Sequence, residues 1–108
     1  MDLFGIKTCD SCRKAVKALE AAGHAVRFHD VRAAPLEADQ LAAFHDAFGA
    51  ELVNTRSTTW RGLSEEERGR DPLALLAAHP TLMKRPVIRA EDGTLYLGWG
   101  KPVQAALV

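Results

Sequence analysis

A Cys-x-x-Cys motif, Cys9-Asp10-Ser11-Cys12, stands between a short apolar run and an amphipathic segment, and this junction constrains the fold more than any other feature of the chain. Residues 3–6 have the length and composition of a buried strand, and the polar pair Lys7-Thr8 ends the run. Within residues 10–22 apolar side chains recur every three or four positions, and Gly23 follows, which predicts a helix that ends there. The motif is therefore predicted to lie where a strand passes into a helix.

Strands and helices continue to alternate after this junction. Residues 25–31 place Val26 and Phe28 in alternation with charged side chains, which predicts a second strand. Residues 36–48 carry apolar side chains at helical spacing and stand between a proline and Gly49, so a second helix is expected.

Short helices and a hairpin are predicted in the second half of the chain. Residues 64–67 have the pattern of a capping box, and Asp71-Pro72 supplies a cap followed by a proline in the first helical turn. One or two short helices are therefore expected before Pro80. The β-prone runs 87–90 and 94–97 flank an Asp-Gly pair, which supplies the positive φ that a tight hairpin turn needs.

Residues 102–108 are expected to form a short helix that ends the sequence. The resulting order, β-α-β, a helical segment, then β-β-α, is typical of a thioredoxin-like fold, in which a parallel crossover pair precedes an antiparallel hairpin. We therefore expect one α/β domain over residues 1–108, with a helical insertion at about 36–80 and a mixed four-stranded sheet.

Composition excludes several classes of protein. The chain has 108 residues, 47% of them hydrophobic, which is enough for one core, and its 14 Lys and Arg balance 14 Asp and Glu, so no general affinity for nucleic acid is expected. The longest apolar runs, residues 73–78 and 103–108, are too short to span a membrane. The N-terminus lacks the basic and apolar regions of a secretory signal, so a cytoplasmic protein is expected.

The two cysteines are the side chains most suited to chemistry. At a helix N-terminus, unpaired N–H groups and the helix dipole favour a thiolate, and Lys7, Arg13 and Lys14 add positive charge close in sequence. Cys9 is therefore the predicted nucleophile. Cys12 shares a helix face with apolar side chains, which suits a less exposed, resolving thiol that attacks a mixed disulfide.

Two alternatives stay open for this pair. Zinc ligation would require two more ligands, and the four histidines show no paired ligand spacing, so no metal is expected. Cys12 could also be a packing residue, because buried unpaired cysteines behave as small hydrophobes.

Arg56 and Arg85 are candidate anion-binding residues outside the motif. Arg56 lies within residues 54–61, a polar segment interpreted as irregular, and such segments often carry function. Arg85-Pro86 leads into the predicted strand at 87–90, where proline sets the backbone and withholds one hydrogen-bond donor. Taken alone, either arginine would more often be a surface salt-bridge partner.

Three motifs together resemble one protein family. They are Gly5-Ile6-Lys7-Thr8-Cys9-Asp10-Ser11-Cys12-Arg13-Lys14-Ala15, Asn54-Thr55-Arg56-Ser57-Thr58-Thr59-Trp60-Arg61-Gly62-Leu63 and His79-Pro80-Thr81-Leu82-Met83-Lys84-Arg85-Pro86-Val87-Ile88. In this order, over about residues 3–100, the chain resembles the arsenate reductase C (ArsC) and Spx family, and most closely its YffB-like branch.

The resemblance implies a thioredoxin-like core with a helical insertion, and Cys9 as the redox cysteine. It also implies that Arg56 and Arg85 lie near Cys9, where they would bind an anion together with Arg13. Pro86 would be structural, since the bond before this proline is often cis in thioredoxin-like folds.

A thiol-dependent reductase is the first functional hypothesis from this resemblance. It would hold no bound cofactor, use glutathione or the thioredoxin system, and act on a small oxidised thiol or oxyanion. Arsenate reductases of this kind carry a further arginine after the last hairpin, where this chain reads Leu97-Gly98-Trp99-Gly100-Lys101, so poor arsenate reduction is expected. The alternatives are a binding module without turnover and a regulator similar to Spx, in which a Cys9–Cys12 disulfide changes the affinity for RNA polymerase.

Overall fold

The computed structural model describes residues 1–108, and they divide into two compact units. Met1–Ala34 and Arg85–Val108 form one, here called the sheet unit, and Pro35–Lys84 form the other, here called the helical unit. That both belong to one domain, with an insertion at about 36–80, stays a prediction.

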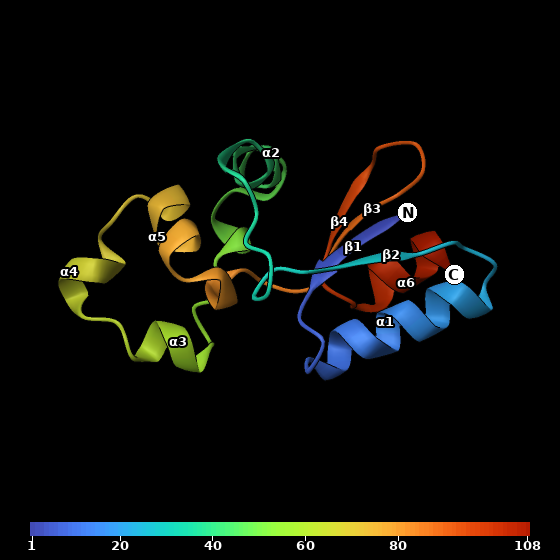
Figure 1. Cartoon of the computed structure of the whole chain (residues 1–108), viewed down its shortest axis with the longest axis horizontal. Coiled ribbons are helices and arrows are strands. Elements are labelled where there is room, and N and C mark those ends of the chain that lie inside the picture. Colours follow the sequence, from blue (N-terminus) through green and yellow to red (C-terminus); the bar gives the residue numbers. More distant parts are fainter. The chain divides into compact units, whose positions relative to one another are not determined.

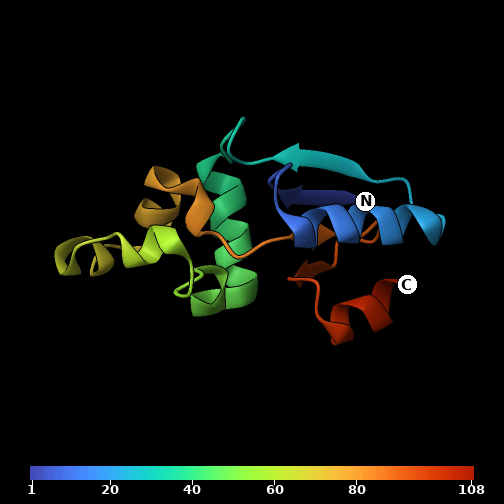
Figure 2. The ribbon, with the colours of Figure 1, turned by 90° about the horizontal axis from the view of Figure 1, so that it is seen from below.

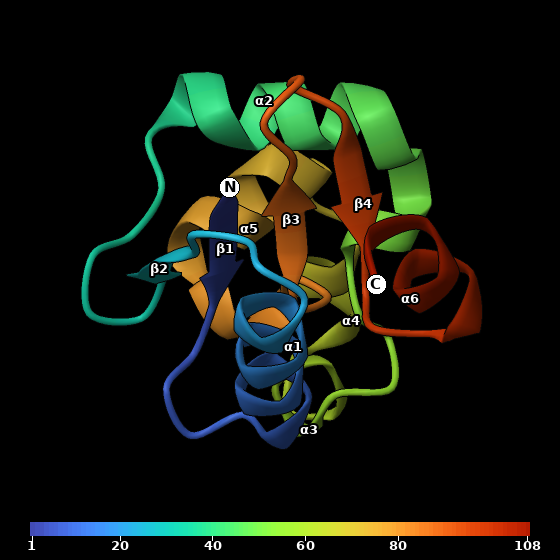
Figure 3. The ribbon, with the colours of Figure 1, turned by 90° about the vertical axis from the view of Figure 1, so that its right-hand side faces the viewer.

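The sheet unit contains the strands β1 (Asp2–Gly5), β2 (Arg27–Asp30), β3 (Val87–Arg89) and β4 (Leu95–Leu97). They lie side by side in the order β2-β1-β3-β4 (Figure 3). β1 runs parallel to β2 and antiparallel to β3, which is antiparallel to β4. The turn between β3 and β4 uses Gly93 at φ 89°, as its Asp-Gly pair predicts. The predicted α/β fold with a mixed four-stranded sheet is confirmed.

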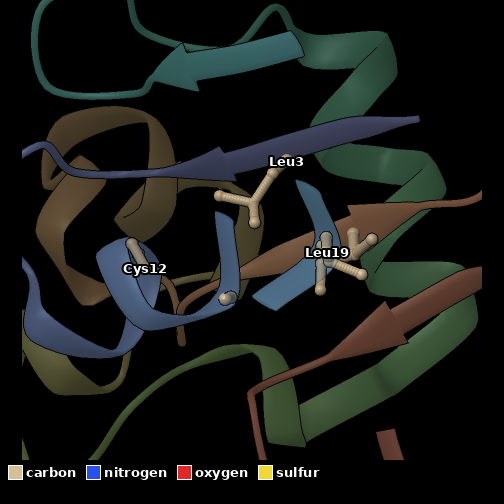
Figure 4. Close-up of a cluster of buried hydrophobic side chains, with 5 residues drawn as sticks. Leu3, Cys12 and Leu19 are labelled. Carbon is tan, nitrogen blue, oxygen red and sulfur yellow. The ribbon is translucent and has the colours of Figure 1, made fainter. Parts of the chain in front are cut away.

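Two helices, α1 (Asp10–Ala21) and α6 (Lys101–Leu107), pack on one face of this sheet (Figure 2). The core there is a cluster of fully buried side chains: Leu3, Cys12, Ala15, Leu19 and Ile88 (Figure 4). α6 adds the half-buried Val103 and Leu107. Burial of a large apolar side chain contributes about 1.5–3 kcal/mol, so this cluster fixes α1 against the middle of the sheet.

The opposite face of β1 carries an ionic cluster around Asp2, whose side chain is only 10% exposed. The carboxylate lies 2.9 Å from His29 Nε2 and accepts from Arg27, and the Arg89 guanidinium lies 3.6 Å away. Phe4, on the same face, stacks on the His29 ring at a centroid distance of 4.7 Å. A buried carboxylate is tolerated here because three partners surround it.

The helical unit contains only short helices (Figure 1). They are α2 (Ala38–Phe48), η1 (Gly49–Leu52), α3 (Thr58–Arg61), α4 (Glu65–Arg68), α5 (Pro72–Ala78) and η2 (Pro80–Leu82). Of the predicted capping box, the N-cap half is present: the Ser64 hydroxyl accepts the Glu67 N–H at 3.2 Å. Asp71 caps α5, as predicted. Across the whole chain, none of the helices combines the length and apolarity needed to cross a membrane.

One local prediction in this unit is wrong. Residues 54–61 were expected to be irregular, whereas α3 occupies their second half. The Ser57 hydroxyl accepts the Trp60 N–H at 3.1 Å, which is an N-cap, and such a cap stabilises a short helix. Ser57 was therefore the sequence signal for this helix. It was overlooked because the threonines after it are common in loops.

Candidate functional site

Cys9 occupies the N-cap position of α1, between β1 and the helix, as the motif predicted. Its backbone is extended, at φ −81° and ψ 120°. Its N–H donates to the Ile6 carbonyl and its carbonyl accepts the Arg13 N–H, each at 3.0 Å. The side chain is half-buried and the thiol is free. Both backbone groups are thus used, and the sulfur is held at the start of the helix.

Cys12, one turn along α1, is fully buried in the core cluster (Figure 4). Burial raises the pKa of its thiol to about 11, and the neighbouring Cys9 adds to the rise. The thiol of Cys12 is therefore protonated at neutral pH and available as a hydrogen-bond donor.

The pKa of Cys9 is lowered from its usual value. Partial burial by itself would raise this pKa, but the backbone N–H and the thiol of Cys12 and the guanidinium of Arg85 together outweigh burial. The Cys9 side chain does not cap α1 through a hydrogen bond. The Cys12 N–H nevertheless lies close enough to favour the charged form of Cys9. The pair thus divides into one thiol that ionises readily and one that does not.

The cation beside Cys9 comes from a distant part of the sequence. Arg85 is among the main causes of the lowered pKa, whereas Lys7, Arg13 and Lys14 are not. Arg13 instead forms an exposed ion pair with Asp10, at 2.8 Å. Proximity in sequence therefore pointed to the wrong cations, because β3 pairs with β1 and carries the segment before it to the start of α1.

Pro86 links Arg85 to β3 and is buried. The Arg85–Pro86 bond is cis, in agreement with the fold analogy. The Pro86 carbonyl accepts the Gly98 N–H at 2.8 Å, which ties the segment to the end of β4. Arg85 thus lies just before β3, at the end of the sheet where β1 passes into α1.

Arg56 lies in the helical unit, at the rim of a polar cavity of about 390 Å³. Its backbone N–H donates to the Asn54 side chain at 3.0 Å, and its exposed side chain forms no ion pair. Lys84 and Glu51 also line the cavity, which therefore has a net positive charge. The expected proximity of Arg56 to Cys9 stays a prediction.

Histidines, cysteines and carboxylates are the side chains of this chain that could hold a metal ion. No cluster of three or more such side chains is present. Asp2 and His29 lie together, but the other partners of that carboxylate are the cations Arg27 and Arg89.

The chain is similar to several known proteins. The ArsC family profile matches residues 4–102. A solved structure of the YffB (PA3664) protein is 30% identical, covers 98% of this chain and 96% of its own, and superposes with a TM-score of 0.86. An uncharacterised protein of Haemophilus influenzae is 40% identical over 96% of each chain. The global transcriptional regulator Spx of Streptococcus pyogenes is 34% identical over 80% of this chain and 69% of its own.

Proposed function

The chain belongs to the ArsC family, a family of thiol-dependent oxidoreductases, and from this premise we propose that it is a glutathione-dependent reductase of oxidised thiols with Cys9 as the nucleophile. The observation that carries the proposal is the opposite displacement of two neighbouring pKa values, lowered at Cys9 and raised to about 11 at Cys12. Only the thiolate attacks sulfur, so the two cysteines have different roles. The free thiols suit a reducing, cytoplasmic setting.

The reaction proceeds by two thiol–disulfide exchanges. The Cys9 thiolate attacks the glutathione sulfur of a glutathionylated substrate, forms a mixed disulfide with glutathione and releases the substrate thiolate, which takes up a proton. A second glutathione thiolate then attacks the mixed disulfide, releases oxidised glutathione and restores the Cys9 thiolate. The substrate gains two electrons, and two glutathione units leave as one disulfide.

Cys12 contributes as a hydrogen-bond donor to the Cys9 thiolate in this scheme. A thiol with a pKa of about 11 supplies very little thiolate at neutral pH, so we expect glutathione from solution, rather than Cys12, to attack the mixed disulfide. The thiol proton of Cys12 lies where it stabilises the charge on Cys9. The proposed mechanism is therefore monothiol.

Arg85, Arg56 and Arg13 are proposed to bind the anionic part of glutathione or its substrate. Arg85 faces the Cys9 thiolate, and a guanidinium binds a carboxylate through two parallel hydrogen bonds. The segment after β4 reads Gly98-Trp99-Gly100 and supplies no arginine. Each missing charged hydrogen bond costs about 1.5–3 kcal/mol, so arsenate should be a poor substrate.

The test is a reductase assay with glutathionylated cysteine, a protein disulfide and arsenate, each supplied with glutathione or thioredoxin as the donor. Glutathionylated cysteine with glutathione is expected to be the fastest pair. Cys9→Ser should abolish turnover, and Arg85→Ala should lower it more than Arg85→Lys, which keeps the charge. Faster turnover with thioredoxin, or arsenate reduction at about 1 s⁻¹ or more, would contradict the respective parts of the proposal.

A transcriptional regulator that binds RNA polymerase is the second candidate function. It is favoured by the 34% identity to the regulator Spx over 80% of this chain, together with the Cys-x-x-Cys motif. In this case oxidation would join Cys9 to Cys12 and alter the affinity for polymerase. The reduced and the oxidised protein can each be used as bait in an extract of its own cells. Only a regulator should retain RNA polymerase to an extent that depends on the redox state, whereas a reductase should not.

A further inference from the structure

A groove in the sheet unit runs along α1, starting near Cys9. Its cavity volume is about 290 Å³, at the lower end of the range for ligand pockets. Six residues line it: Lys7, Arg13, Val16, Lys17, Glu20 and Phe28. None of them has a place in the chemistry proposed above, apart from the anion-binding role given to Arg13.

The floor of the groove is apolar. Val16, on α1, and Phe28, on β2, are both half-buried and pack against the core cluster. Phe28 pairs in register with Leu3, so it lies on the sheet face that α1 covers. An apolar side chain placed between α1 and β2 would therefore contact Val16 and Phe28 together.

The rim of the groove is positively charged. Lys7, Arg13 and Lys17 are exposed, and only Glu20 opposes them. Neither Lys7 nor Lys17 forms an ion pair, and the ion pair of Arg13 with Asp10 uses one nitrogen of a guanidinium that has five N–H donors. The groove is thus complementary to a ligand that combines an apolar group with negative charge.

The spacing of these charges matches an extended peptide. Arg13 and Lys17 are four residues apart on α1, which separates them by about 6 Å along the helix axis. Alternate side chains of an extended chain lie about 6.6–6.8 Å apart on one side, while the side chain between them points the other way. Two carboxylates can therefore meet Arg13 and Lys17 while the intervening apolar side chain points toward Phe28. Glu20, one turn further, would repel a third carboxylate.

The groove is also close to the reacting sulfur. The Arg13 N–H donates to the Cys9 carbonyl at 3.0 Å, and Lys7 precedes Cys9 by only two residues. A peptide held along α1 therefore places its next residues beside Cys9.

We propose that this groove binds an extended acidic segment of a protein substrate, with one apolar residue between two carboxylates, and so selects which oxidised cysteines reach Cys9. The inference rests on the proposed reductase function and adds a protein substrate class to it. An open groove beside a helix with regularly spaced cations suits a chain segment.

The test uses a fluorescein-labelled peptide containing Glu-Leu-Glu followed by serine, which binds without reacting, and a matched peptide containing Gln-Leu-Gln. Fluorescence anisotropy with the reduced, full chain should give tighter binding of the acidic peptide. Lys17→Glu replaces an attraction between exposed charges by a repulsion, so it should weaken that binding by about two- to tenfold. Lys14→Glu makes the same charge change on the same helix outside the groove and should leave binding unchanged. Circular dichroism of both variants checks that α1 remains folded.

Turnover separates this inference from the function on which it rests. With a glutathionylated cysteine in place of serine, Lys17→Glu should raise KM for the acidic peptide and leave kcat and the alkylation rate of Cys9 unchanged. Selective binding without any reduction would overturn the reductase proposal and still support the groove. Equal binding of the two peptides, or equal losses in Lys17→Glu and Lys14→Glu, would overturn the groove. An NMR titration in which glutathione alone shifts the amide signals of Lys17 and Phe28 would also overturn the groove as a peptide site, because glutathione itself would then occupy it.

Discussion

Gly5 at the end of β1 lies so close to Cys12 that a Cβ atom on Gly5 would overlap the Cys12 Sγ and lie 3.2 Å from the Cys12 Cβ. The glycine therefore lets the buried cysteine fit against the strand. Because the Cys12 thiol in turn faces Cys9, the lack of a side chain at Gly5 sets the position of the whole pair.

Gly5→Ala should destabilise the protein by about 1–3 kcal/mol, because the neighbouring thiol lies in a closely packed core and cannot move away cheaply. Urea denaturation measures the loss. Gly62→Ala is the matched control, since its Cβ would meet only backbone oxygens at an ordinary 3.6 Å, and it should be neutral or slightly stabilising. Equal stability of Gly5→Ala and the wild type would contradict the close packing of Cys12.

Replacing Cys12 distinguishes a donor from a resolving thiol. Cys12→Ala should raise the pKa of Cys9 and slow its alkylation at pH 7 by about fivefold, the equivalent of one hydrogen bond worth about 1 kcal/mol. Cys12→Ser keeps a donor and should retain most of the wild-type rate. Iodoacetamide labelling against pH measures both. If alanine and serine slow turnover equally while leaving the pKa of Cys9 unchanged, Cys12 is a resolving thiol and the mechanism uses two cysteines.

The ionic cluster at Asp2 should make the free energy of unfolding depend on pH in the acid range. Burial alone would raise the pKa of Asp2, but His29, Arg27 and Arg89 outweigh burial and hold it below its usual 3.8. A lowered pKa means that the carboxylate stabilises the fold above about pH 4 and loses this effect as the pH falls through the folded-state value.

Asp2→Asn should therefore lower the free energy of unfolding by roughly 1–3 kcal/mol at pH 7, with the difference from wild type shrinking below pH 4. Urea denaturation at several pH values measures it. Asp46→Asn removes an exposed carboxylate that forms no ion pair and should have little effect at either pH. A difference for Asp2→Asn that stays constant down to pH 3 would show that the effect is not electrostatic.

The contribution of His24 to stability should fall as the pH rises, whereas that of Asp2 falls as the pH is lowered. Its Nε2 lies 2.8 Å from the Leu107 carbonyl and its Nδ1 3.3 Å from the Glu91 carboxylate. Both ring nitrogens thus face acceptors, which only the imidazolium can satisfy, and the bond to Leu107, followed by Glu91, raises the pKa of His24. The stabilisation is complete below the usual pKa of 6.5 and is lost as the pH rises through the folded-state value.

Wild type and His24→Ala should therefore differ most in stability at pH 5.5 and least at pH 8.5. Amide hydrogen exchange in α6, corrected for the intrinsic pH effect, should report the same weakening because Leu107 ends that helix, while α1 serves as the internal control. A difference between the two proteins that grows with pH would reverse the sign and refute the assignment.

We also predict that the two units unfold together as one domain. The two tryptophans report on them separately, because Trp60 lies in the helical unit and Trp99 in the sheet unit. Trp99→Phe and Trp60→Phe should show fluorescence transitions in urea that coincide with the circular dichroism transition of the same variant. Two resolved transitions, with different probes reporting different midpoints, would instead indicate two domains.

Much of the fold could be predicted from local patterns. The helix after Cys9, the hairpin around Gly93 and the cap at Ser64 each depend on residues within a few positions of one another, so spacing and capping rules suffice. The cap at Ser57 follows the same rules but was missed, because threonines follow it and threonine is common in loops.

The sequence by itself thus determined where Cys9 would lie, at the passage from a strand to a helix, and that Cys12 would face the core. The family resemblance implied that Arg85 lies near Cys9, but local patterns pointed to Lys7, Arg13 and Lys14 instead. The tertiary structure shows how Arg85 comes to stand beside Cys9 and that Gly5 leaves space for the Cys12 thiol. Arg85 is brought to Cys9 by the pairing of β3 with β1, across most of the chain, and no periodicity in the sequence encodes that register. Pairing between distant strands depends on the whole core, since it is chosen by how the apolar faces fit together.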